Sequence, residues 1–156
     1  MAKSPQVRKE ATNFRLEPIV KYTAEIAARV QRKNLTTFLE WSMSESFKKL
    51  TFDDGNTIAS QMDYLWDIDE ADRFIKLAYT YPRLLTYDEQ HLLKLINENF
   101  SVFKKDPDNF IPTNKDEEAA FKANIPMLAF IDFKKVRDRW TNLNNYIKGE
   151  EPLDLS

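Results

Sequence analysis

Glycine is scarce in this chain: Gly55 and Gly149 are the only two among 156 residues. Folds with many tight turns or a glycine-rich phosphate loop depend on glycine, because it adopts positive φ angles without steric cost. Rossmann, P-loop and small all-β barrel folds are therefore disfavoured, and a mainly α-helical protein is expected. Hydrophobic residues make up 42% of the chain and aromatic residues 13%, which is enough apolar surface for a packed core.

The formal net charge of −2 conceals an uneven distribution. Residues 1–50 hold 10 Lys/Arg and 5 Asp/Glu, a net charge of +5, whereas residues 51–156 hold 13 and 20, a net charge of −7. A basic N-terminal part joined to an acidic remainder indicates that the basic part meets a polyanion. The alternative is that charge has drifted along the chain by chance.

Residues that carry chemistry are few. The chain has no cysteine and a single histidine, His91, which excludes disulfides and thiolate metal sites and leaves the histidine no second ligand to share a metal with. No pattern of catalytic residues stands out, so we expect neither an enzyme, nor a cofactor, nor a metal site. No apolar run approaches the ~20 residues that span a bilayer, and the N-terminus lacks a signal peptide's apolar stretch. We therefore expect a cytoplasmic protein without membrane contact.

A short strand is predicted over residues 11–16, where polar and apolar side chains alternate. Its polar face would present three side chains: Lys9, Asn13 and Arg15. No second convincing strand occurs in the chain, so the backbone groups of this one need an outside partner. The simplest partner is the same strand of a second copy, which would make an antiparallel ribbon in a homodimer.

Two helices are predicted after the strand, over residues 18–31 and 37–50, because apolar residues recur there every three or four positions. Between them Asn34 suits the end of the first helix, and Thr36 is a candidate N-cap of the second. The dimer core is expected to gather six apolar side chains from the strand and the helices: Phe14, Leu16, Ile26, Phe38, Leu39 and Phe47.

A turn cluster from Asp53 to Asn56 marks the expected domain boundary. The predicted organisation is an N-terminal domain over residues 1–52, an all-α helical domain over 57–149 and a flexible tail over 150–156. Within the helical domain, helices are predicted over about 69–79, 86–103, 116–123 and 133–147, the second of them opened by a capping box. The aromatic residues of this domain are most simply its core, and nothing in the sequence demonstrates a ligand pocket among them.

Two charged clusters of the helical domain have ordinary structural explanations. The acidic residues within 67–72 lack the glycine and the distant glutamate of an EF-hand loop, so we expect them to cap and charge a helix N-terminus. The basic residues within 134–139, beside Trp140, are scattered around the helix axis. We expect them to form a solvated face rather than a second nucleic-acid patch.

The order of strand, helix, turn and helix over residues 8–50 resembles the ribbon-helix-helix family, the class of the Met and Arc repressors. The resemblance implies a dimer whose two-stranded ribbon enters the major groove of double-stranded DNA. It implies base contacts from Lys9, Asn13 and Arg15. It also implies phosphate contacts from a second set: Arg8, Lys33, Thr36 and Thr37.

These expectations combine into one function, a homodimeric and sequence-specific DNA-binding transcriptional regulator acting as a repressor. Two alternatives stay open. One is the antitoxin of a toxin–antitoxin pair, which would autoregulate through the same domain. The other is a helical protein-interaction module that does not bind DNA. The helical domain could bind a protein partner or a small ligand, and assembly beyond a dimer on DNA is left open.

Overall fold

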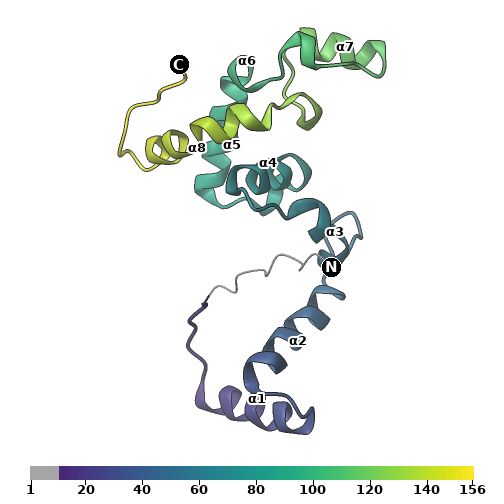
Figure 1. The fold of residues 1–156 in the computed structure, drawn as a ribbon, viewed down its shortest axis with the longest axis vertical. Helices are drawn as coiled ribbons and strands as arrows, with labels where there is room; N and C mark the ends of the chain where they lie inside the picture. Colours follow the sequence, from purple (N-terminus) through teal and green to yellow (C-terminus); the bar gives the residue numbers. More distant parts are fainter. Residues whose placement is uncertain (1–10) are drawn as a thin grey trace, which may run out of the picture. The chain divides into compact units, whose positions relative to one another are not determined.

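A computed structural model of the chain describes residues 11–156, which are mainly α-helical (Figure 1). Arg8 and Lys9, which the sequence placed on DNA, lie outside the described residues. The chain divides into two compact units: the N-terminal unit, residues 1–60, and the C-terminal unit, residues 61–156. The division falls inside helix α3 (Ile58–Leu65), just after the turn cluster around Gly55. No helix within residues 11–156 is long and apolar enough to cross a membrane.

Helices α1 (Pro18–Val30) and α2 (Leu35–Phe47) form the N-terminal unit. Proline at the first position suits a helix start, because its fixed φ is helical and its missing N–H has no partner there. Two residues after α1, Arg32 has a φ of 53°, which lets the Lys33 N–H donate to the Ala28 carbonyl at 2.9 Å. The left-handed residue is thus Arg32 and not Asn34.

Asn34 has a different role, as the N-cap of α2. It adopts an extended conformation, and its side-chain oxygen accepts a hydrogen bond from the Thr37 N–H at 2.8 Å. The cap expected at Thr36 is therefore wrong by two residues, and the helix begins at Leu35. Thr36 and Thr37 lie inside its first turn, where the cap already occupies one of the free backbone donors.

The predicted strand is absent. Residues 11–17 have no regular secondary structure, and residues 11–156 contain only isolated bridges, Thr51 with Thr57 and Lys104 with Ile131. Alternation over six residues fits a solvent-exposed extended segment as well as a strand, and only backbone pairing makes it a strand. The described chain offers that segment no pairing partner. The resemblance to the ribbon-helix-helix family is therefore wrong, because its defining strand is missing.

The C-terminal unit is all-helical. Besides the end of α3 it contains five α-helices: α4 (Glu70–Thr80), α5 (Tyr87–Glu98), α6 (Phe100–Phe103), α7 (Lys115–Lys122) and α8 (Phe133–Ile147). The capping box at the start of α5 is confirmed, since Glu89 accepts the Thr86 N–H at 2.7 Å and donates its own N–H to the Thr86 hydroxyl. The expected helix 86–103 is interrupted at Asn99, whose φ of −110° and ψ of 30° are not helical.

A phenylalanine-rich core holds the C-terminal unit together. Helix α8 contacts α4, α5 and α6, and Figure 1 shows it lying across them. Phe100, Phe103 and Phe130 are fully buried in this core. Phe130 also makes edge contacts with Phe110 and Phe121, at centroid distances of 5.0 and 5.4 Å. Packing of this kind is sufficient to stabilise a unit of about 100 residues.

The last residues of the chain lie against α8. Leu153 and Leu155 pack on the core. The Asn142 side chain donates to the Pro152 carbonyl at 3.0 Å and accepts the Asp154 N–H at 2.8 Å. Residues 150–156, expected as a flexible tail, thus have a defined docking place on the C-terminal unit.

Candidate functional site

The described residues that were predicted to contact DNA lie at the two ends of α1. Asn13 and Arg15 are exposed in the irregular segment before Pro18. Lys33, Thr36 and Thr37 lie at the turn into α2. Because α1 has 13 residues, its length of about 20 Å separates the two groups. A single chain does not bring the predicted base contacts and phosphate contacts together.

The turn between α1 and α2 gathers basic side chains that have few acidic partners. Lys33 lies 5.0 Å from the centre of the Trp41 ring, a cation–π contact that sequence reasoning missed. Within residues 11–156, Arg29 and Arg32 form no ion pair. Lys33 lies before α2 and Trp41 lies within it, so helical periodicity does not predict that the two side chains meet.

The predicted dimer core is largely exposed in a single chain. Ala28 is the only buried residue within residues 11–60. Phe38 and Leu39 are half-buried between the helices. The other four expected core residues are exposed: Phe14, Leu16, Ile26 and Phe47. Residues 11–60 therefore form no core of their own.

An exposed apolar stripe runs along α1, formed by Ile19, Tyr22, Ile26 and Val30. Ile19 is 72% exposed and Val30 is 76% exposed. The spacing of three or four residues places all four on one face of the helix, opposite the buried Ala28. A hollow of about 340 Å³ opens between the helices beside this stripe, with Val20, Ala24 and Phe38 among its lining residues.

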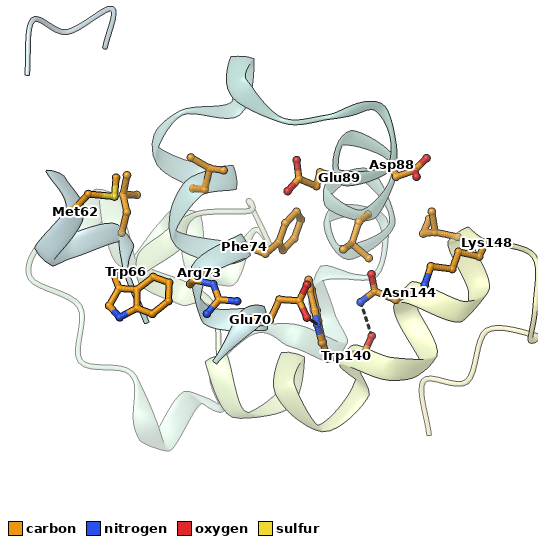
Figure 2. A pocket seen from close by; sticks show the side chains of 14 residues that line it. Met62, Trp66, Glu70, Arg73, Phe74, Asp88, Glu89, Trp140, Asn144 and Lys148 are labelled. Carbon is orange, nitrogen blue, oxygen red and sulfur yellow. Dashed lines mark hydrogen bonds between the residues drawn. The ribbon is translucent and has the colours of Figure 1, made fainter. Parts of the chain in front are cut away.

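A second candidate site is a pocket of about 420 Å³ on the C-terminal unit, called here the α4–α8 pocket (Figure 2). It lies among α4, α5, α8 and the end of α3, and its floor is apolar. The floor consists of six side chains: Leu65, Phe74, Leu77, Leu92, Trp140 and Ile147. Its edge carries five charged side chains: Glu70, Arg73, Asp88, Glu89 and Lys148.

The indole rings at the α4–α8 pocket are held by specific contacts. Trp140 packs on Phe74 at a centroid distance of 5.3 Å, and its N–H donates to Glu70 at 3.3 Å. Trp66 is 64% exposed, with the Arg73 guanidinium 4.8 Å from its ring centre. Arg73 also donates to the Asp67 carbonyl at 2.8 Å. Figure 2 shows Trp66 and Arg73 side by side at one end of the pocket and Lys148 at the other.

This pocket was missed at the level of sequence because its aromatic residues were all assigned to the core. Phe74 is buried as expected, but Trp66 is largely exposed and Trp140 is half-buried. Periodicity does not separate a core tryptophan from one that lines an open pocket. The only sequence feature that points to this pocket is the acidic cluster just after Trp66, which the sequence analysis interprets as helix capping. That explanation is confirmed for Asp69, which accepts the Ala71 N–H at 3.0 Å.

Asp72 is the buried charged residue of this unit. It pairs with Arg137 of α8 at 2.7 Å, while its second oxygen, Oδ1, has no hydrogen-bond partner among the described residues. Burial raises the pKa of Asp72, and the nearby Arg137 opposes that shift. The half-buried Asp67 behaves in the opposite way, since its hydrogen bond with Lys76 lowers its pKa.

The other charged groups singled out from the sequence have structural partners. On α8, Lys134 pairs with Asp138 and Lys135 pairs with Asp106, so the basic residues do not form one patch. His91 is exposed and its ring lies 4.1 Å from that of Tyr87. Residues 11–156 contain no group of His, Cys, Asp and Glu side chains able to hold a metal ion.

Comparison with known proteins finds no match among protein-family models, among curated proteins or among solved structures. Any function must therefore be argued from the residues and their surroundings.

Proposed function

We propose that the protein is a homodimeric DNA-binding transcriptional regulator whose N-terminal unit both self-associates and contacts DNA. The observation that carries the proposal is the combination of charge and exposure in this unit. Residues 1–60 have a net charge of +3, from 10 basic and 7 acidic residues. Within residues 11–60 only Ala28 is buried. A basic unit that lacks a core needs both a partner for its apolar face and an anion for its charges.

Self-association follows from the stability of the isolated helices. Helices α1 and α2 have 13 residues each, a length at which an isolated helix is marginal in water. Most helix stability in proteins comes from packing an apolar face, and the stripe of Ile19, Ile26 and Val30 is unpacked. Burying each such side chain contributes about 1.5–3 kcal/mol.

A second copy is the partner that matches this surface. In a two-fold dimer the same patch lies on both chains, so one apolar stripe meets its equal. The hollow beside the stripe can receive a side chain from the other copy. Arg29 borders the stripe, three residues after Ile26, whereas Arg32 and Lys33 lie beyond the end of α1 in the turn to α2.

DNA is the polyanion that suits the charges left exposed. Arg29 and Arg32 form no ion pair within residues 11–156, and Lys33 adjoins them at the start of α2. Dimer formation would bring two copies of this basic turn, and of Asn13 and Arg15, into one particle. That arrangement supports phosphate contacts at two places on a duplex, with the exposed Asn13 and Arg15 as the side chains able to contact base edges.

The antitoxin alternative is the less favoured one. An antitoxin segment that wraps a toxin usually folds only on binding. The C-terminal unit instead has a phenylalanine-rich core with Phe100, Phe103 and Phe130 fully buried. A unit with that much buried aromatic surface is expected to melt cooperatively by itself, which circular dichroism of residues 61–156 would show.

Fluorescence anisotropy with labelled duplex DNA from upstream of the protein's own gene tests the proposal. Binding should weaken steeply as salt rises, because phosphate contacts release condensed counterions. Lys33→Ala should weaken binding to all duplexes alike and reduce the salt slope by about one. Arg15→Ala should reduce the preference for one duplex over another. Absence of binding at low salt would rule out the proposal and favour the interaction module.

A further inference from the structure

We propose that the α4–α8 pocket binds a small organic cation with an apolar body, such as an aromatic or branched amine. The pocket has a volume of about 420 Å³, within the range of about 300–1,000 Å³ that small-molecule sites occupy. All of its lining residues belong to the C-terminal unit, so the site is complete within that unit.

The floor of the pocket is apolar and therefore favours a ligand with an apolar body. Phe74, Leu92 and Trp140 form an apolar surface contributed by three different helices. Trp66, at one end, has 64% of its surface exposed to solvent. A tryptophan held in place at an open apolar cleft offers a face on which a ring or a branched chain can lie.

The edge of the pocket determines the sign of the ligand's charge. It carries three carboxylates, Glu70, Asp88 and Glu89, and two cations, Arg73 and Lys148. Arg73 keeps its positive charge, but it donates to the Asp67 carbonyl at 2.8 Å and lies over Trp66, at one end of the pocket. Three carboxylates therefore stand against two cations, a formal net charge of −1 at the edge, and the field at the mouth favours a positive ligand.

Two of these carboxylates are placed to hold an ammonium group. Figure 2 shows Glu70 and Glu89 on either side of Phe74, at the edges of the floor. Glu70 uses one oxygen for the Trp140 N–H, and Glu89 uses one oxygen for the Thr86 cap. Each carboxylate can still accept further hydrogen bonds, since a carboxylate offers about four lone-pair positions.

The charge of the unit as a whole agrees with this choice. Residues 61–156 hold 13 Lys/Arg and 18 Asp/Glu, a net charge of −5. An anionic ligand, or an acidic segment of another protein, would have to overcome both the local and the overall field. A cationic ligand is drawn in by both.

Three probes of nearly equal size test the proposal: 2-phenylethylamine, 2-phenylethanol and 3-phenylpropionate. Their binding to the full chain can be followed through tryptophan emission, because Trp66 and Trp140 line the site. We expect the amine to bind about fivefold or more tightly than the alcohol, through charge-assisted hydrogen bonds, and the carboxylate to bind most weakly. Equal or tighter binding of the carboxylate, or no binding of any probe, would overturn the proposal.

A double variant, Glu70→Gln with Glu89→Gln, separates the charge from the shape of the site. Glutamine still accepts a hydrogen bond from Trp140 and still completes a capping box, so folding should be preserved. The amine should then bind no better than the alcohol, whose own affinity should not change. Glu118→Gln, on α7 away from the pocket, is the matched control. An unchanged preference for the amine in the double variant would contradict the assignment. None of these outcomes depends on DNA binding, so the two proposals can fail separately.

Discussion

The two units of this chain are both built from amphipathic helices, but they bury the apolar faces of those helices to very different extents. In the C-terminal unit, helices close over a core in which Phe100, Phe103 and Phe130 are fully buried. In the N-terminal unit, helices of similar length leave Ile19 and Val30 more than two-thirds exposed. The C-terminal unit is acidic and the N-terminal unit is basic. The difference shows that amphipathic helices alone do not make a stable unit, since the apolar face must also find a partner.

The largest effect is expected in the core of the C-terminal unit. Phe130→Ala removes a fully buried ring that contacts Phe110 and Phe121, and should lower the free energy of unfolding by about 3–5 kcal/mol. Urea denaturation followed by circular dichroism measures this loss. A loss below about 1 kcal/mol would show that the unit is not built around this cluster.

A smaller but more informative effect is expected on the N-terminal unit. The double variant Ile19→Ser with Val30→Ser removes exposed apolar groups, so it should leave the fold of the single chain intact. It should raise the dimer dissociation constant about tenfold to a hundredfold, because the proposed dimer buries that surface between its two copies. Sedimentation velocity measures the shift.

Ile68→Ser provides the control for this prediction. Ile68 is 92% exposed on the C-terminal unit. The substitution therefore removes a comparable apolar group from a surface outside the proposed interface. Its dissociation constant should match that of the unaltered protein. An equal loss of self-association in the control and in the double variant would place the interface elsewhere.

An effect of about 1 kcal/mol is expected where α1 ends. Arg32 adopts a left-handed φ of 53°, a conformation that costs a residue with a Cβ about 1–2 kcal/mol. Arg32→Gly should therefore stabilise the N-terminal unit, as seen in thermal denaturation. Asn124 has a φ of 59° in the C-terminal unit, and Asn124→Gly should gain less, because asparagine tolerates this region better. A greater gain at Asn124 would contradict the argument.

The smallest effect concerns two aspartates of the C-terminal unit whose pKa values move in opposite directions. Burial raises the pKa of Asp72 above its ordinary 3.8, so its ionised form opposes folding above the raised pKa and the penalty disappears below about 3.8. Asp72→Asn should be the more stable protein near neutral pH, and its advantage should vanish on acidification. An advantage that persisted at low pH would assign the effect to packing.

Asp67 supplies the opposite case. The hydrogen bond from Lys76 lowers its pKa, so its ionised form supports folding above about 3.8 and that support is lost as the pH falls through the lowered pKa. Asp67→Asn should be the less stable protein near neutral pH, and the difference should disappear in acid. Urea denaturation at several pH values measures both aspartates in one series.

The sequence predicted helices better than it predicted what the helices do. Helix α8 begins at Phe133 and ends at Ile147, the predicted bounds, because its period is regular and Asp132 caps it. Thr86 and Glu89 likewise identified the start of α5. These are local signals, in which the residues that fix a boundary lie within one turn of it.

The sequence did not correctly predict features that depend on contacts between residues distant in the chain. Alternation over residues 11–16 predicted a strand, but a strand also needs a neighbouring backbone, which the pattern does not contain. The α4–α8 pocket depends on where Trp66 and Trp140 come to lie after three helices have packed. Nothing in the spacing of these tryptophans distinguishes a pocket wall from a core.

Sedimentation equilibrium of the full chain at micromolar concentration, without DNA, tests the central claim most directly. The claim is that residues 11–60 form no core of their own and are completed by a second copy. It predicts a species of twice the chain mass of 18.4 kDa. A single species at 18.4 kDa, with α1 and α2 still helical, would contradict it.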